Sequence, residues 1–471
     1  MTSRFPRRPA LLAAVSGVAL LIAGAASAQT VPDDATSVDD IVVTGTRAPA
    51  RSRLDTLAPV DVVTAETLQN RGTTEFAAAL AQTVPSLTFQ RPSANDGTDS
   101  IRPATLRGLS PDQTLVLVNG TRRHASALVN VNGTVGRGSA AVDLNAIPSG
   151  ALDRVEVLRD GASAQYGSDA IAGVVNLRLK EAREGGGASV TYGQYFTNVE
   201  TARGKRDEQD GRAVTVSAWQ GFGLGSDGFL TLSAEYSDRD PTNRSDYDPR
   251  PAANGAITAR FGDPKVEQWS VFANAGKPLN ADWEAYGWAG YQERDSSSAA
   301  FPRLSNNPNN VPYIYPNGFL PKIAINSQDV SAAGGVRGTL AGWDADFSLV
   351  YGRNALDFRT EDSLNATYGA ASPTSFDSGG LTYDQLVFGA DFTRQFEIGL
   401  DGGPLNFAWA WRPARRTIRS TPASRNRGIA ARWDRTPPWP AAPRASPASS
   451  PRTRSMKTAT PWPCTPTSKS R

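Results

Sequence analysis

Apolar and polar residues alternate with a period of two along the chain beyond Gly185-Gly186-Gly187. Leu230, Leu232, Ala234 and Tyr236 alternate with Thr231, Ser233 and Glu235 in one stretch, and Trp343, Ala345, Phe347, Leu349 and Tyr351 alternate with Asp344, Asp346 and Ser348 in another. A strict period of two is typical of a β-strand that has one apolar and one polar face. We therefore expect strands near 188–195, 211–221, 229–238, 266–277, 283–294, 328–338, 343–356, 386–398 and 405–410.

Two architectures would give this alternation. A transmembrane β-barrel turns its apolar face to lipid and carries aromatic residues at the interfaces, whereas a soluble β-sandwich turns its apolar face inward. The connections favour the barrel. Those after strands two, four, six and eight are tight, while those after strands one, three, five and seven are long and polar, as in 240–265 and 296–326. Periplasmic turns and extracellular loops alternate in this way.

A different pattern precedes the alternating strands, and it predicts a small α+β domain over residues 49–184. We expect short strands at Val60–Val63, 87–90, 104–107 and Thr114–Val118, and two helices, one capped by Thr64 and one over 75–82 capped by Thr73 or Thr74. Asn119-Gly120 is a strong hairpin signal. Residues 91–102 and 123–138 are polar or glycine-rich and read as loops.

The end of this domain has a distinctive order of elements. Residues 154–159 alternate as a strand, Asp160-Gly161 forms a turn, and Val174–Leu179 returns as a strand. The stretch from Leu144 to Lys180, together with LRGLSPDQTLVLVNGTR at 106–122, resembles the plug domain of TonB-dependent outer-membrane receptors. The resemblance implies an α+β plug domain followed by antiparallel strands of a transmembrane β-barrel. We expect that barrel to be incomplete here and to be followed by a disordered C-terminal tail.

The N-terminus has the three parts of a secretory signal. Residues 1–28 contain Arg4, Arg7 and Arg8, then an apolar run, then small residues before Gln29. Residues 29–48 are polar except for Ile41, Val42 and Val43, which precede Thr44. This segment is either the first strand of the next domain or an exposed strand that pairs with a partner's sheet edge. It resembles the TonB box of the same family, which implies that Ile41, Val42, Val43 and Thr44 bind the TonB energy-transducing complex.

Cysteine and histidine usage leaves little room for catalysis or metal binding. Cys464 is the sole cysteine and His124 the sole histidine, so a disulfide framework, a Ser-His-Asp site and a His/Cys metal cluster are all disfavoured. We expect no catalytic residue, cofactor or resident metal. Because binding residues concentrate on loops of rigid scaffolds, the candidate substrate contacts are Arg91, Asp96, Asn130 and Arg137 in the two plug loops.

The last 61 residues differ from the rest in every respect. Residues 411–471 hold 14 of the 49 basic residues, one of the 46 acidic residues, and 11 prolines. This segment is either a basic, disordered arm or the product of an out-of-frame reading of a GC-rich gene. The simultaneous change in charge, cysteine usage and periodicity favours the second interpretation, and no nucleic-acid partner is expected. Strands are not expected beyond Ala410, because proline at this density interrupts strand pairing.

The sequence thus predicts an exported protein of the outer membrane of a Gram-negative bacterium. By resemblance, its function is active import of a scarce solute, with a ferric siderophore as the family's default substrate and cobalamin, saccharides or other metals as further possibilities. A plugged barrel of this kind has about 22 strands, and nine are predicted here, so we expect this chain not to form a stable barrel or to transport. The alternatives are a secreted or periplasmic binding module without transport, and an inert gene remnant.

Overall fold

The structure is a computed structural model of the whole chain. It describes residues 41–42, 51–52, 59–131, 134–398, 405–423 and 454–458. The predicted signal segment 1–28 lies outside the described residues, as do Val43 and Thr44. No helix among the described residues is long and apolar enough to cross a membrane.

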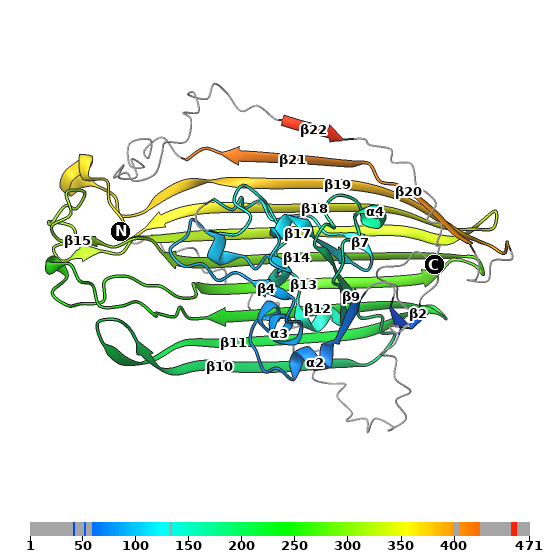
Figure 1. Cartoon of the computed structure of the whole chain (residues 1–471), viewed down its shortest axis with the longest axis horizontal. Coiled ribbons are helices and arrows are strands. Elements are labelled where there is room, and N and C mark those ends of the chain that lie inside the picture. The colour runs from blue at the N-terminus through cyan, green and yellow to red at the C-terminus, as the bar shows by residue number, and fades with distance from the viewer. Residues whose placement is uncertain are drawn as a thin grey trace.

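A large antiparallel sheet runs the length of the molecule (Figure 1). Among the described residues it has 11 strands. In spatial order they begin with β10 (Gly186–Glu200), β11 (Lys205–Leu224), β12 (Gly228–Arg239), β13 (Lys265–Pro278), β14 (Trp283–Ala299), β17 (Lys322–Leu340), β18 (Trp343–Glu361) and β19 (Phe376–Phe396). All of the predicted barrel strands are found, and most are longer than the alternation indicated, because extended polar segments continue them at the end that carries the long loops.

The predicted difference between tight turns and long loops is confirmed from the second connection to the seventh, while residues 399–404 of the predicted tight connection after β19 lie outside the described residues. Three residues join β11 to β12, and the pair Ala341-Gly342 joins β17 to β18 with positive φ at both positions (52° and 76°). The connections 240–264, 300–321 and 362–375 are long. The prediction of a long loop after β10 is wrong. The polar residues expected to form that loop pair as strands, and only residues 201–204 remain as the turn.

The strands around the tight turns carry an aromatic cluster. Trp343 lies 5.9 Å from Phe407 and 6.1 Å from Phe396 between ring centroids, and Phe392 stacks on Trp409 at 4.4 Å. A second pair, Trp269 and Tyr291 at 4.9 Å, lies nearer the long loops. Large apolar side chains exposed between these positions include Leu232, Val271, Val330 and Leu349. Apolar residues bounded by aromatic residues are typical of the lipid-facing side of a transmembrane β-sheet.

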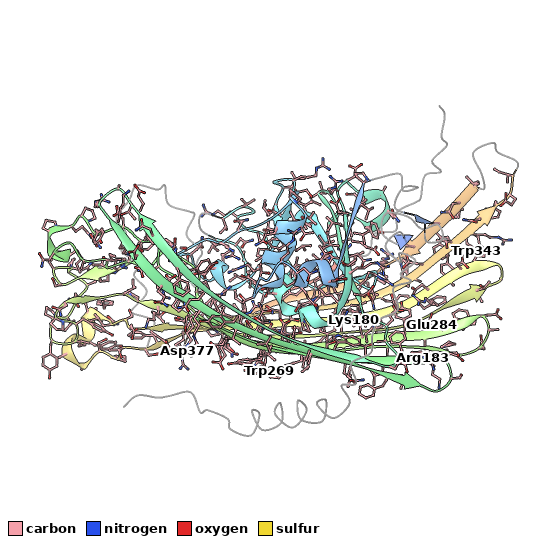
Figure 2. All side chains as sticks on the ribbon, turned by 90° about the horizontal axis from the view of Figure 1, so that it is seen from below. Lys180, Arg183, Trp269, Glu284, Trp343 and Asp377 are labelled. Carbon is pink, nitrogen blue, oxygen red and sulfur yellow. The ribbon has the colours of Figure 1, made fainter. Side chains whose placement is uncertain are left out.

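The α+β domain, called here the plug, lies on the concave side of this sheet (Figure 2). Its own five-stranded sheet has the order β3-β8-β9-β6-β7. The strands are β3 (Val60–Thr64), β8 (Leu152–Leu158), β9 (Gly173–Leu179), β6 (Thr114–Val118) and β7 (Thr121–Arg122), and a separate pair joins β4 (Leu87–Phe89) to β5 (Ala104–Leu106). The Asn119-Gly120 hairpin is confirmed, with positive φ at both residues.

Helices α2 (Ala65–Gln69), α3 (Phe76–Thr83) and α4 (Ser163–Tyr166) complete the plug. The side chain of Thr64 caps α2, as predicted. The predicted cap of α3 is wrong: the N-cap residue is Glu75 rather than Thr73 or Thr74, and its side chain makes no capping bond. The carboxylate of Glu75 binds arginine side chains instead, which provide stronger partners than the amides of one helical turn.

One apolar core holds the plug sheet, its helices and the large sheet together. Leu80, Leu106, Leu152, Val155 and Leu177 are fully buried in it, and Phe272, Trp288, Ala333, Val350 and Val387 enter it from the large sheet. Fully burying side chains of this size stabilises a protein by about 1.5–3 kcal/mol each. The plug and the large sheet, called here the wall, are therefore packed as one body.

The prediction that no strand follows Ala410 is wrong. Strand β20 (Leu405–Trp411) and strand β21 (Ala414–Thr421) both pair with β19, in registers that continue one another across Pro413, and β22 (Arg454–Thr458) pairs with β21. Only one proline lies between 405 and 421, and Arg412 and Arg419 bind Asp391 and Asp384 of β19 at 2.6 and 2.8 Å. The proline-dense sequence begins later than the change in charge.

Candidate functional site

The two plug loops lie against the half of the wall that carries the long loops. Ser93 Oγ donates to the carbonyl of Gly262 at 3.1 Å, and Ser296 Oγ donates to Ser100 Oγ at 2.8 Å. Ile101, Ala127 and Leu128 are buried against Ile325, Leu356 and Tyr383 of the wall. These wall residues lie near the ends of β14, β17, β18 and β19 from which the long connections leave. The loops of the plug and the long loops of the wall therefore share one end of the molecule.

The opposite end of the plug is fixed near the tight turns. Ala182 N donates to Thr231 Oγ1 at 2.9 Å, and the ammonium of Lys180 lies 5.2 Å from the Trp219 ring. Figure 2 places Lys180 and Arg183 toward the same end as Glu284 and Trp343, away from Asp377. The plug thus extends along the inner face of the wall, from the end with the tight turns toward the end with the long loops.

Glu75 is the centre of a buried ion cluster between plug and wall. Its carboxylate lies 2.6 Å from Arg102 Nε, 2.8 Å from Arg239 Nη1 of β12, and 3.2 Å from Arg91 Nη2, and it accepts from Asn145 Nδ2 at 2.7 Å. Burial alone would raise the pKa of Glu75, but the three guanidinium groups hold it well below its usual range. Glu75 is therefore a carboxylate that links three separate segments of the chain.

A second cluster joins the plug to β14. Arg294 Nη1 lies 2.6 Å from Asp143 Oδ2 and donates to the Ser100 carbonyl at 2.7 Å, while Asp143 Oδ1 accepts from the Arg102 amide at 3.0 Å. Close by, Asp99 is 2 % exposed, and burial raises its pKa to about 6. The first loop is thus held by charged contacts at Arg91 and again at Ser100 and Arg102.

A third cluster joins the second loop to β17 and β18. Arg123 and His124 both bind the carboxylate of Asp329, and Asn354 Oδ1 accepts from the amide of Ala127 at 2.8 Å. All of these side chains are buried. Sequence reasoning missed the three clusters, because their bonded members are separated by up to 227 residues; the one available signal was an acidic residue, Glu75, at a predicted helix start.

The four predicted contact residues lie in different environments. Arg91 is ion-paired with Glu75 and Asp263. Asn130 is 1 % exposed, and both its backbone N–H and its side-chain Nδ2 donate hydrogen bonds to Ser139. Asp96 is half-buried, and Arg137 is exposed. The structure brings Arg91 into the Glu75 cluster and leaves Arg137 on the surface of the second loop.

A pocket lies between the long connections 240–264 and 300–321 of the wall. Its lining includes Tyr247, Arg250, Phe261, Phe301 and Arg303. Phe261 and Phe301 are 41 % and 55 % exposed, so their rings are accessible to a solute. The lining also holds Asp246 and Asp248, whose carboxylates pair with Arg203 and Arg250 at 2.6 and 2.5 Å. The pocket thus offers aromatic faces beside guanidinium groups whose charge is partly compensated, which suits a solute that has both planar and anionic parts.

Residues 52–174 match the family model described as the TonB-dependent Receptor Plug Domain. The vitamin B12 transporter BtuB of Vibrio cholerae is 27 % identical over 283 residues, which are 57 % of this chain and 40 % of that protein. The ferric enterobactin receptor PirA of Pseudomonas aeruginosa is 30 % identical over 160 residues, 34 % of this chain and 21 % of the relative. The chain therefore spans less than half of the curated relatives that it matches.

Solved structures share the fold. A mutant of the ferric enterobactin receptor PfeA from Pseudomonas aeruginosa superposes with a TM-score of 0.52 at 18 % identity, over 77 % of this chain and 49 % of that one. The siderophore receptor PirA from Acinetobacter baumannii gives a TM-score of 0.52 at 16 % identity, over 76 % and 48 %. Likeness at this level of identity establishes the arrangement of plug and wall.

Proposed function

We propose that this chain is part of a TonB-dependent outer-membrane receptor and takes part in active uptake of a scarce solute across the outer membrane of a Gram-negative bacterium. The match of residues 52–174 to the plug family model and the fold shared with solved receptors support the proposal. The observation that carries the proposal is the orientation of the plug. Its loops meet the long loops of the wall through charged and apolar contacts, whereas its C-terminal exit meets the tight turns. A solute arriving from outside would meet the plug loops first.

Energy would enter through the N-terminal segment, by way of the TonB energy-transducing complex. Strand β1 (Ile41–Val42) pairs antiparallel with β2 (Arg51–Ser52), which supports the ability of this segment to form backbone pairs. Figure 1 draws β2 toward the end with the tight turns, where a periplasmic partner could reach it. We assign Ile41, Val42, Val43 and Thr44 as the strand that such a partner would pair with.

The solute would be bound between the plug loops and the pocket formed by the wall's long loops. Arg137 is the first candidate among the plug residues because it is exposed, and Asp96 is the second because it is half-buried. Arg91 and Asn130 would act indirectly, by holding the two loops in place. Relatives are named for vitamin B12 and for ferric enterobactin, and a ferric siderophore is our first proposal, since the pocket offers guanidinium groups beside aromatic rings.

The second candidate function is a secreted or periplasmic module that binds a solute without transport. The observation that favours it is that the described strands form an open sheet, in which β10 pairs with β11 alone. An open edge leaves backbone groups unpaired, which a bilayer does not tolerate. No catalytic role is proposed for either candidate.

The proposal is tested by the interaction of the N-terminal segment with TonB. A peptide covering residues 38–47 should bind the periplasmic domain of TonB in a calorimetric titration, and a peptide with Val42→Pro and Val43→Pro should not, because proline removes the amide donors that strand pairing needs. A third peptide with Val42→Thr and Val43→Thr keeps those donors and should still bind. Equal binding by the proline peptide would remove the assignment of Ile41–Thr44.

A further inference from the structure

His124 is buried between the plug and the wall, directly after the plug strand β7. It is 3 % exposed. Its imidazole lies against Gly352 of β18, where even a Cβ atom would overlap the ring. The wall therefore has a glycine at a position where the imidazole comes close to its backbone, and a larger residue would displace His124.

Hydrogen bonds fix the imidazole to the neighbouring strand. His124 Nε2 lies 2.9 Å from Asp329 Oδ2 of β17. The same carboxylate binds Arg123 and accepts from Asn354 Nδ2 at 3.2 Å, and Asn354 in turn accepts from the amide of Ala127. Arg123, His124, Asp329 and Asn354, together called the latch here, tie residues 123–127 of the plug to two strands of the wall.

The charges of the latch balance when the imidazole is neutral. The side chains of Arg123 and Asp329 are 1 % and 6 % exposed and form a buried ion pair. Nε2–H of neutral His124 donates a further hydrogen bond to the Asp329 carboxylate without adding charge. Asp384 of β19 is a further charged group near the latch. Its carboxylate lies 2.8 Å from Arg419 and 3.9 Å from Arg353, so its negative charge is already compensated. Protonation of His124 would place an unbalanced positive charge in a buried site.

The direction of the pH effect follows from this balance. Burial lowers the pKa of His124, although Asp329 acts in the opposite direction. The undocked imidazole would titrate near its ordinary value of about 6.5. Docking is therefore fully favoured above that value and is lost as the pH falls below it, with the ratio of docked to undocked plug segment decreasing by up to about tenfold per pH unit.

We propose that the latch is a pH-sensitive device, in which neutral His124 holds the second plug loop against β17 and β18 and protonated His124 releases it. Its consequence for solute binding rests on the proposed function, because the released loop is the one that carries Arg137. The latch itself does not depend on transport. Its test therefore measures docking of the loop and not uptake.

The test measures a distance from the plug loop to the wall by double electron–electron resonance. Nitroxides are placed at Val131→Cys in the loop and Leu340→Cys at the end of β17, directly before the tight turn, both exposed in the structure, in the full chain with Cys464→Ser in detergent micelles. Because Asp99 also titrates near pH 6, every variant carries Asp99→Asn. We expect one narrow distance at about pH 7.5 and a second, broader population that grows as the pH is lowered to about 5.

Two variants with opposite expectations serve as controls. His124→Gln keeps an N–H donor for Asp329 but does not titrate, so it should keep the narrow distance at both pH values. Gly352→Ala excludes the imidazole and should give the broad population at both. A pH response in His124→Gln equal to that of the parent, or no response in the parent, would overturn the latch. A broad distance already present in the parent at about pH 7.5 would show that the loop is not docked at all, and would also overturn it.

Discussion

At the scale of single residues, some conformations depend only on neighbours in the chain, and others depend on partners that the fold brings together. Asn119-Gly120 was a predicted turn and adopts it, because a hairpin of this type depends on its own two residues. Arg91 stays a predicted solute contact, and its ion pair with Asp263, which is 172 residues away, could not be found from the sequence. Asn130 is buried and bonds Ser139. Pairings of this kind depend on the fold and cannot be found from spacing alone.

Glu75 gives the sharpest prediction at this scale. Glu75→Ala would leave Arg102 and Arg239 buried without their shared carboxylate, and the free energy of unfolding should fall by about 3–5 kcal/mol. Urea denaturation of the chain in detergent micelles, followed by tryptophan fluorescence, measures the change. Glu66→Ala on the exposed face of α2 is the matched control and should cost less than about 1 kcal/mol. Equal effects of the two substitutions would mean that the cluster does not hold plug and wall together.

At the scale of elements, the alternation with a period of two predicted where the strands lie but did not predict the residues at which they begin and end. Lipid-facing residues must be apolar, so alternation is clear only within the membrane, and the extended segments beyond it carry polar residues on both faces. This is why β10 and β11 continue through residues that were predicted to form a loop. Strand β21 was missed for a different reason: the prediction used the proline density of the whole segment 411–471, whereas no proline lies within Ala414–Thr421.

The orientation of the elements can be tested by labelling with a membrane-impermeant thiol reagent. With Cys464→Ser as background, Arg137→Cys in the second plug loop should react from the cell exterior, because that loop lies at the end with the long loops. Ser226→Cys, in the tight turn between β11 and β12, should react only after the outer membrane is permeabilised. The reverse order of labelling would mean that the molecule is oriented the other way.

At the scale of the whole molecule, sequence reasoning indicated a plug followed by barrel strands, and both are found. It could not place the plug on the wall, because the contacts that do so are the buried clusters around Glu75, Arg294 and Asp329. We propose that the change in composition within 411–471 reflects an out-of-frame reading of the gene. Figure 1 shows β21 between β19 and β22, so a change of frame near codon 410 would coincide with a strand that still pairs.

The central claim is energy-dependent uptake through a plug that is coupled at Ile41–Thr44. The most direct measurement is accumulation of a radioactively labelled ferric siderophore, with labelled cobalamin in parallel, by cells that lack their own receptors and express the gene with its frame restored after codon 410. We predict accumulation of one of these solutes that stops when a protonophore is added. Accumulation should also be absent in the Val42→Pro, Val43→Pro variant, while solute binding to its cells stays near that of the parent. Accumulation that persists without the proton gradient, or in the proline variant, would contradict the account.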